Sequence, residues 1–200
     1  WKLTQSPFHP TLYVAPGNGG TAEIAENVPI AAENIDGLLQ FVISTKIDLT
    51  IVGPEGPLAE GIVDRFDEAG RLIFGPSQRA AMIESSKSFA KTVMASAGVQ
   101  TAAARTFSAI DDALTFIEAQ APPYVIKANG LASGKGVIMT CNRIDATAAI
   151  RDMMEGKMFG TAGETVLIEE WLTGQEISVF AFVDGEYVSP LVAACDYKRV

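Results

Sequence analysis

A glycine-rich segment between two apolar runs constrains this chain more than any other feature. The segment from Pro123 to Thr140 reads PYVIKANGLASGKGVIMT. Tyr124–Ile126 and Val137–Met139 have the composition of short β-strands. The residues between them, which we call the flap (residues 128–136), combine glycines with lysine and expose backbone N–H groups and positive charge. We therefore expect a strand, a loop that covers a polyphosphate, and a second strand.

The flap is not a P-loop of the form G-x-x-x-x-G-K-[ST]. Asn129 stands at the position of the first glycine, and Gly136 stands at the position of the hydroxyl that binds magnesium. The residues after the flap favour a strand, whereas a P-loop opens a helix whose N-terminus receives the phosphate. A plain hairpin with a flexible tip is the alternative, but it gives no reason for lysine at both Lys127 and Lys135.

Composition limits the classes of function. The chain has 200 residues and is 48% hydrophobic, which is enough for one large domain or two smaller ones. Its net charge of -9 argues against nucleic acid and anionic membranes as partners. Cys141 and Cys195 lie far apart and His9 is the single histidine, so a disulfide framework and a zinc site are not expected. No apolar run approaches the roughly 20 residues of a membrane span, and we expect a cytoplasmic protein.

The two ends of the chain suggest a fragment. The sequence begins at Trp1 with WKLTQSP, which resembles the last turn of a helix before a Ser-Pro turn. It stops at Val200, shortly after the strand-like run Leu191–Ala194. We expect structural elements to be cut at both ends.

Strand-like and helix-like patterns alternate in the first part of the chain. Strand patterns occupy Leu12–Ala15, Asp48–Val52 and Arg71–Phe74. Helical spacing of apolar residues covers Ile35–Lys46 and Leu58–Ala69. This alternation predicts βαβ units with a parallel sheet.

Two glycine-containing loops follow strands of this predicted sheet. They are Gly17–Thr21 and Gly53–Pro57. Ligands of parallel sheets bind at the carboxyl ends of the strands, so both loops are candidate ligand loops, although ordinary turns explain each one equally well. A Rossmann dinucleotide fingerprint is absent.

The remainder of the chain predicts a second architecture. Gln78–Ala97 reads as a helix in two pieces joined near Ser85, with Lys87 near the start of the second piece. A lysine there is usually a solvated helix residue. The turn signal Asp184-Gly185 predicts a hairpin, so from Val166 onward we expect an antiparallel sheet. Two architectures predict two domains, residues 1–80 and residues 81–200.

A pair of carboxylates closes the apolar run Val166–Leu172. Glu169 and Glu170 stand beside Trp171. They fit either a solvated strand end or a strand edge that lends its backbone to an adenine. In the second case the carboxylate of Glu176 is placed to meet ribose hydroxyls.

Taken together, these segments resemble the ATP-grasp ligases, and within them the phosphoribosylamine–glycine ligase family. The flap indicates the superfamily, whereas PGNGGTA and GPEGPL are narrower motifs of the family. The matching segments run in the family's order over nearly all of the chain. They are Val14–Ala22, Asp48–Asp64, Phe74–Ser77, Ser85–Lys91, Tyr124–Val137 and Val166–Ser178.

The resemblance implies a fold and a set of site residues. The fold is α/β, with a parallel, Rossmann-like pre-ATP-grasp domain followed by part of an ATP-grasp domain that has an antiparallel sheet. The implied catalytic residue is Lys135. The implied phosphoribosylamine-side residues are Gly17, Asn18, Glu55 and Pro57. The implied ATP-binding residues are Lys87, Lys127, Gly130, Ser133, Gly134, Lys135, Gly136, Val137, Glu169, Glu170, Trp171, Leu172 and Glu176.

The family's reaction transfers the γ-phosphate of ATP to glycine, and the amine of 5-phosphoribosylamine then attacks the acyl phosphate. Mg²⁺ or Mn²⁺ is implied as well, with its acidic ligands expected beyond Val200. The partners implied are these small molecules alone. Two alternatives remain. Another ATP-grasp enzyme, such as a biotin carboxylase or a formate-dependent purine ligase, shares the flap without both narrower motifs. A non-catalytic nucleotide-binding module needs no metal ligands.

Overall fold

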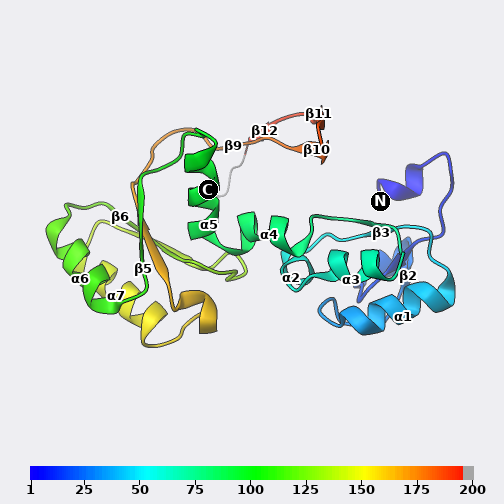
Figure 1. Ribbon diagram of the computed structural model, residues 1–200, viewed down its shortest axis with the longest axis horizontal. Coiled ribbons are helices and arrows are strands. Elements are labelled where there is room, and N and C mark those ends of the chain that lie inside the picture. Colours follow the sequence, from blue (N-terminus) through cyan, green and yellow to red (C-terminus); the bar gives the residue numbers. More distant parts are fainter. Residues whose placement is uncertain (196–200) are drawn as a thin grey trace.

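The computed structural model describes residues 1–195 and consists of two lobes bridged by one helix (Figure 1). The N-terminal lobe (residues 1–77) lies at the right of Figure 1 and carries short strands and three helices. Its elements in chain order are η1 (Leu3–Gln5), β1 (Tyr13–Val14), η2 (Thr21–Glu23), β2 (Glu26–Asn27), α1 (Ile35–Thr45), β3 (Thr50–Ile51), α2 (Glu55–Ala59), α3 (Ile62–Glu68) and β4 (Ile73–Phe74).

The strands of the N-terminal lobe form two parallel pairs, β1 with β2 and β3 with β4. The predicted parallel pairing is therefore confirmed. Among the described residues, however, the pairs do not join into the single sheet that the alternation predicts, and β2 was not predicted at all. Helices α1 and α3 supply the small core, which consists of Leu39, Val42, Ile62, Val63 and Phe66.

Two local predictions in this lobe are wrong. The expected loop Gly53–Pro57 already turns helical at Glu55, where α2 begins. Pro57 is compatible with the first turn of α2, because the N–H groups of a first helical turn have no partner within the helix. The expected helix Leu58–Ala69 is interrupted at Gly61, whose φ of +85° is readily adopted by glycine alone.

Helix α4 (Gln78–Ser85) connects the lobes and is followed directly by α5 (Lys87–Ser96). The predicted break between two helical pieces is confirmed at Ser86, whose backbone is extended. The α4 N-terminus is tied to the N-terminal lobe, since Asp64 Oδ2 accepts a 2.6 Å hydrogen bond from the backbone N–H of Gln78. Helix α4 is thus anchored to the N-terminal lobe. We call Ser86, the extended residue between α4 and α5, the elbow.

The second lobe, which we call the sheet lobe (residues 87–169), is built on a four-stranded sheet. The strand order is β5-β8-β6-β7, and every neighbouring pair is antiparallel. Antiparallel pairing therefore begins earlier in the chain than the predicted start at Val166. The elements are β5 (Ala104–Phe107), α6 (Ile110–Ala119), β6 (Tyr124–Ala128), β7 (Val137–Thr140), α7 (Arg143–Met154), η3 (Gly160–Gly163) and β8 (Val166–Glu169).

Alternation along β6 gives this sheet two different faces. Tyr124, Ile126 and Ala128 enter the core with α6 and α7, and each is at most 2% exposed. Val125 and Lys127 therefore point to the opposite face, which α5 borders. The same alternation acts along β8, so one face of the sheet makes the core and the other is available for a site.

The chain leaves the sheet lobe through β9 (Ile177–Ser178), β10 (Ala181–Asp184), β11 (Tyr187–Pro190) and β12 (Ala194–Cys195). The predicted hairpin is confirmed, because β10 pairs with β11 around Gly185. Residues 177–183 do not form one strand, since β9 ends at Ser178 and pairs with β12, whereas β10 begins at Ala181. The hairpin extends over the N-terminal lobe (Figure 1), where Phe182 meets Phe74 edge to face at 5.7 Å. Within residues 1–195, no helix has the length and apolar character needed to cross a bilayer.

Candidate nucleotide cleft

A cleft of 1420 Å³ opens between α5, the free face of the sheet and residues 170–176. Most of the predicted ATP-binding residues line it. These are Lys87, Lys127, Gly134, Val137, Glu169, Glu170, Trp171, Leu172 and Glu176. The others, Gly130, Ser133, Lys135 and Gly136, belong to the flap but not to the lining. The structure thus gathers residues that are far apart in the sequence, and their contact with nucleotide stays a prediction.

One buried carboxylate organises the inner wall of this cleft. The Glu169 side chain is 6% exposed and pairs with two ammonium groups: Lys127 Nζ lies 2.5 Å from one carboxylate oxygen, and Lys91 Nζ lies 3.2 Å from the other. The solvated strand end that the sequence left open is therefore wrong for Glu169. A buried carboxylate needs such partners, because desolvation of an unpaired charge is costly.

Lys91 is a site residue that the sequence reasoning missed. Its ammonium also donates to Thr101 Oγ1 and to the carbonyl of Ala102, both at 2.8 Å. These bonds tie α5 to the segment before β5 and fix the carboxylate of Glu169 from one side. The signal was present in the sequence, since Lys87 and Lys91 are spaced i,i+4 and so share one helix face.

Lys87 lies at the start of α5 and reaches the root of the flap. Its ammonium donates to the carbonyls of Ala128 at 2.7 Å and Gly130 at 2.9 Å. Burial lowers the pKa of Lys87, and repulsion from Lys127 lowers it further. The usual reading of this position as a solvated lysine does not fit a side chain with these contacts, which place a positive charge on the cleft wall.

The flap has a fixed root and an open tip. At the root, the N–H of Asn129 donates to the carbonyl of Thr165 at 2.9 Å, and the N–H of Gly130 donates to that of Ala162 at 3.0 Å. At the tip, Ser133 and Gly134 adopt positive φ values of 49° and 74°, and both residues are exposed. A segment with so few bonds opens at low free-energy cost, so the tip is able to move while the root stays in place.

Lys135 stands at this tip. It is exposed, and its ammonium makes no hydrogen bond or ion pair within the described part of the chain. The next residue, Gly136, is buried, and a Cβ atom there would lie 2.7 Å from the Cβ of Ala132. The flap is therefore closely packed at Gly136, and its tip carries one positive charge that has no partner among the described residues.

The outer wall of the cleft continues past the end of β8. The backbone N–H of Glu170 donates to the carbonyl of Ala103 at 2.8 Å, and the N–H of Ala103 donates back to the Glu170 carboxylate at 3.2 Å. This exchange extends the β5–β8 pairing by one residue and turns Trp171 and Leu172 toward the cleft. The arrangement offers a strand edge with backbone groups, which fits the predicted adenine contact.

The candidate ligand loops lie in the N-terminal lobe, apart from this cleft. Gly17 has a φ of +76°, and a Cβ atom there would lie 2.1 Å from Asn27 Oδ1, so only glycine fits. The side chain of Asn18 closes its own loop, since its Oδ1 accepts from the N–H groups of Gly20 and Thr21. Glu55 is exposed at the start of α2.

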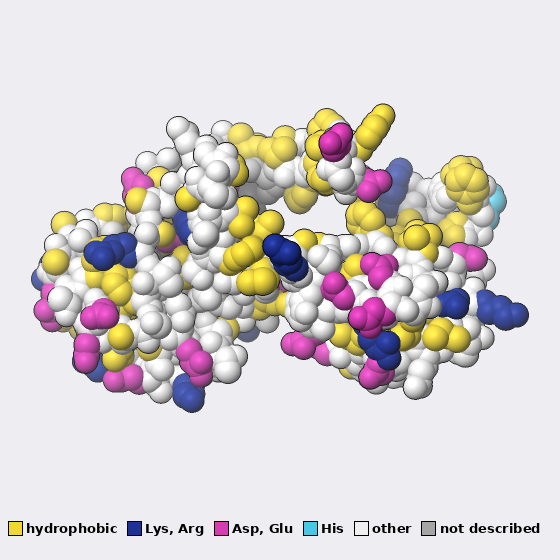
Figure 2. Space-filling model, viewed as in Figure 1, with side chains coloured by type: hydrophobic (Ala, Val, Ile, Leu, Met, Phe, Trp, Pro, Cys, Tyr) yellow, Lys and Arg dark blue, Asp and Glu magenta, His cyan; other side chains and the backbone are white. Residues whose placement is uncertain are grey.

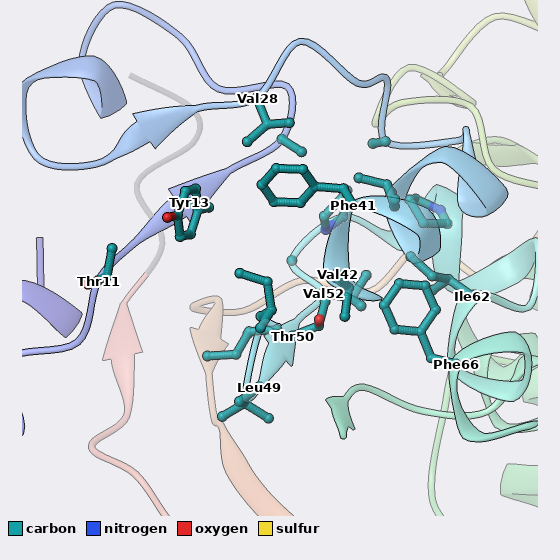
Figure 3. A pocket seen from close by; sticks show the side chains of 18 residues that line it. Thr11, Tyr13, Val28, Phe41, Val42, Leu49, Thr50, Val52, Ile62 and Phe66 are labelled. Carbon is teal, nitrogen blue, oxygen red and sulfur yellow. The ribbon is translucent and has the colours of Figure 1, made fainter. Parts of the chain in front are cut away.

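Pro57 is fully buried and lines an apolar cavity of 180 Å³ between β1 and β3 (Figure 3). Tyr13 and Thr50 face this cavity from the two strands, and Phe66 closes it from α3 (Figure 3). The cavity also borders Gly53, where one candidate loop begins, and Ala15, two residues before the other. The bases of the two loops therefore border the same cavity.

No metal centre is formed by the described residues. Across residues 1–195, His, Cys, Asp and Glu side chains form no group of three that could hold an ion. The buried carboxylate of the cleft wall, that of Glu169, already pairs through its two oxygens with the ammonium groups of Lys91 and Lys127. Cys141 and Cys195 are exposed and free.

A solved structure shows the fold, and a family model identifies the class of protein. A biotin carboxylase–β,γ-ATP complex from Campylobacter jejuni superposes with a TM-score of 0.70 at 21% identity, over 90% of this chain and 43% of that one. At this identity the likeness concerns the fold. Residues 85–200 match the family model described as "Phosphoribosylglycinamide synthetase, ATP-grasp (A) domain". The chain is an ATP-grasp protein.

Residues 1–84 match a second model, "Phosphoribosylglycinamide synthetase, N domain". The chain belongs to the phosphoribosylglycinamide synthetase family. The phosphoribosylamine–glycine ligase of Halalkalibacterium halodurans is 49% identical over 100% of this chain and 46% of its own length. A structure of the Thermotoga maritima phosphoribosylamine–glycine ligase matches with a TM-score of 0.74 at 27% identity, over 94% of this chain and 45% of that one. The chain thus spans about half the length of the relatives it matches.

Proposed function

We propose that the full-length protein carrying this chain joins glycine to 5-phosphoribosylamine at the expense of ATP, in purine biosynthesis. The products are glycinamide ribonucleotide, ADP and phosphate, and glycyl phosphate is the intermediate. The observation that carries the proposal is the 49% identity to a phosphoribosylamine–glycine ligase across the whole of this chain. The matched region includes the N-terminal lobe as well as the lobe that carries the nucleotide cleft of the superfamily.

The chemistry places modest demands on the protein. Transfer of a phosphoryl group to a carboxylate depends on positioning and on neutralising charge, so lysines and backbone amides serve without a side-chain nucleophile. Lys87 and Lys127 bind the phosphates from the cleft wall. Lys135 acts as the catalytic residue when the flap closes, with Gly130, Ser133, Gly134, Gly136 and Val137 shaping its approach.

The remaining contacts divide between adenosine and the amine substrate. The backbones of Glu170 and Leu172 bind adenine next to Trp171, and Glu176 binds the ribose. Glu169 acts on ATP indirectly, because it pairs with Lys127. In the N-terminal lobe, Gly17, Asn18, Glu55 and Pro57 form the phosphoribosylamine side. The bonds within the Asn18 loop support a role for Asn18 in setting the shape of this loop. Pro57 is buried and lines the cavity of this lobe, so its role is structural support of the site.

The other expectations follow from this function. The described residues form no cluster of three His, Cys, Asp or Glu side chains that could hold Mg²⁺ or Mn²⁺, so we place its ligands outside them and derive no step through the ion. Small molecules are the partners, and the cytoplasm is the location. The lobes correspond to two domains, residues 1–80 and 81–200, of which residues 196–200 lie outside the described part.

The test is substrate-dependent ADP release by the full-length protein. We expect ADP to form only when ATP, glycine and 5-phosphoribosylamine are all present. Turnover with bicarbonate or formate in place of glycine would instead favour another ATP-grasp enzyme. ATP binding without turnover on any of these substrates would favour the nucleotide-binding module.

A further inference from the structure

Asn129 joins three parts of the sheet lobe at the root of the flap. Its N–H donates to the carbonyl of Thr165 at 2.9 Å, which anchors it to the segment before β8. Its carbonyl accepts from the N–H of Lys87 at 3.0 Å, and its side-chain Oδ1 accepts from the N–H of Ser88 at 2.9 Å. Asn129 therefore connects the flap root to the first turn of α5, which is 41 residues away in the sequence.

These bonds complete the N-terminus of α5. The first N–H groups of a helix have no partner within the helix and need other acceptors. Ser86 Oγ accepts from Phe89, the third of them, at 3.4 Å, whereas Asn129 accepts from the first two. The carboxamide of Asn129 also donates to Ser86 Oγ at 3.4 Å. The cap of this helix is thus shared between the elbow and the flap.

Both ends of Lys87 are fixed by the same three flap residues. The backbone N–H of Lys87 binds Asn129, and the ammonium binds the carbonyls of Ala128 and Gly130 on either side of it. A polyphosphate is a stronger acceptor for an ammonium group than a neutral carbonyl. The ammonium is able to move to such a ligand while the backbone bonds to Asn129 hold its α-carbon in place.

We propose that Asn129 is a positioning residue, which holds Lys87 at the phosphate end of the cleft and ties the elbow at Ser86 to the flap. The proposal rests on the proposed function, in which Lys87 binds the phosphates of ATP. Asn129 itself touches no substrate. Its effect on nucleotide passes through Lys87 and therefore concerns the phosphates and not the adenosine.

The first experiment measures the Kd of ATP with Mg²⁺, and of adenosine, by calorimetry on the full-length protein. In Asn129→Ala the N–H of Ser88 loses its acceptor, so the first turn of α5 is less well ordered. The loss of such a helix cap should weaken ATP binding by about tenfold. We expect that loss for ATP and an unchanged Kd for adenosine. Asn129→Asp keeps an oxygen at the helix N-terminus, where negative charge is favourable, and should restore the affinity for ATP.

The second experiment combines Asn129→Ala with Lys87→Met. If Asn129 acts through Lys87, the double variant should bind ATP about as weakly as Lys87→Met alone, because displacing Lys87 has no further effect on ATP once its ammonium is absent. Should Asn129→Ala fail to fold, Asn129→Ser gives the same comparison, since its shorter side chain does not reach the N–H of Ser88.

The outcomes separate the two proposals. Equal losses for ATP and adenosine in Asn129→Ala would show a merely structural residue and overturn the inference. Additive losses in the double variant would overturn it too, while leaving Lys87 as a phosphate ligand. An unchanged ATP affinity in Lys87→Met would overturn the assignment of Lys87, and with it the route by which Asn129 acts, whereas the proposed reaction is tested by ADP release.

Discussion

The two lobes achieve order in different ways. In the sheet lobe, strands of four or five residues bury a core of 12 residues on one face and leave the other face for the cleft. In the N-terminal lobe, each strand has two residues, and the core has five buried residues beside a cavity. Longer strands make alternation effective, because each added pair of residues extends the core and the site together.

Polar groups follow the same division. In the sheet lobe, Glu169 is paired with lysines from a helix and from the neighbouring strand. In the N-terminal lobe, the polar bonds of the ligand loop are local and link Asn18, Thr21 and Asn27 within nine residues. The sheet lobe therefore gives its charges fixed positions through long-range packing, whereas the N-terminal lobe shapes its loop through turn chemistry.

Truncation of the larger core should give the largest effect. Ile126 is fully buried in the central strand β6, and Ile126→Ala removes packing on both neighbouring strands. We expect a loss of about 2–5 kcal/mol in the free energy of unfolding, measured by urea denaturation. Leu72→Ala is the matched control, since this side chain is 68% exposed and should change stability by less than about 0.5 kcal/mol. Equal effects at the two sites would contradict the description of the core.

The buried carboxylate should give the next largest effect. Glu169→Gln keeps the shape of the side chain and leaves two partly buried lysines without their counter-charge. We expect a loss of about 3 kcal/mol in the free energy of unfolding. The neighbouring Glu170→Gln changes an exposed group with one backbone bond, and should cost about 1 kcal/mol or less. If Glu169→Gln lowers the free energy of unfolding no more than Glu170→Gln does, the Glu169 side chain is a solvated strand end.

Lys127, just before the flap, and Lys135, at its tip, should differ in their effects on the kinetics. Lys127 is held by Glu169, so its ammonium meets phosphate alike in the ground and transition states, and Lys127→Ala should mainly raise the KM for ATP. Lys135 is unengaged at the flap tip, so Lys135→Ala should mainly lower kcat. One charge-assisted hydrogen bond corresponds to a factor of about 10 to 150 in each case.

Steady-state kinetics on the full-length protein measures both variants. Near-wild-type values for Lys135→Ala would favour the plain hairpin tip. A lowered kcat with an unchanged KM for Lys127→Ala would show that its ammonium is fixed only at the transition state.

The smallest expected effect is the pH dependence at Lys87. Because burial and Lys127 lower its pKa below the ordinary 10.5, the unfolded chain binds this proton more tightly than the folded chain does. Between the folded and ordinary pKa values the unfolded state carries more protons, so stability from this group rises with pH. The melting temperature of the wild type, relative to Lys87→Met, should therefore increase as the pH is raised toward 10.5. A flat or falling difference would contradict the lowered pKa.

Much of this fold was predictable because local patterns specify it. The apolar, strand-like composition of β6, the glycines of the flap and the turn at Gly185 each predicted the element that is observed. The break at Ser86 was predictable for the same reason, since serine caps the helix that follows. The separation of β1 from β3 was not, because pairing between strands depends on contacts that no local pattern records.

The site was predictable in part. The lysines of the cleft follow the family's motifs, and their shared location was expected. The burial of Glu169 was not, because it depends on ammonium groups from α5 and β6 that the sequence separates by 36 residues. The i,i+4 spacing of Lys87 and Lys91 was a usable signal for Lys91, but Asn129 had none. The partners of Asn129 are backbone groups and side chains of other elements, and such hydrogen bonds become visible only once the chain is folded.

The contact between Phe182 and Phe74 changes how the two lobes can move. Helix α4 is a covalent crossing between them, and the β10–β11 hairpin makes a second crossing, so the molecule closes into a ring around an opening (Figure 2). A body attached at one point swivels freely, whereas one attached at two points turns only about the line that joins them. One aromatic pair contributes about 0.5–1.5 kcal/mol beyond its buried area. The hairpin thus adds a weak, non-covalent restraint on rotation of the lobes to the covalent one through α4.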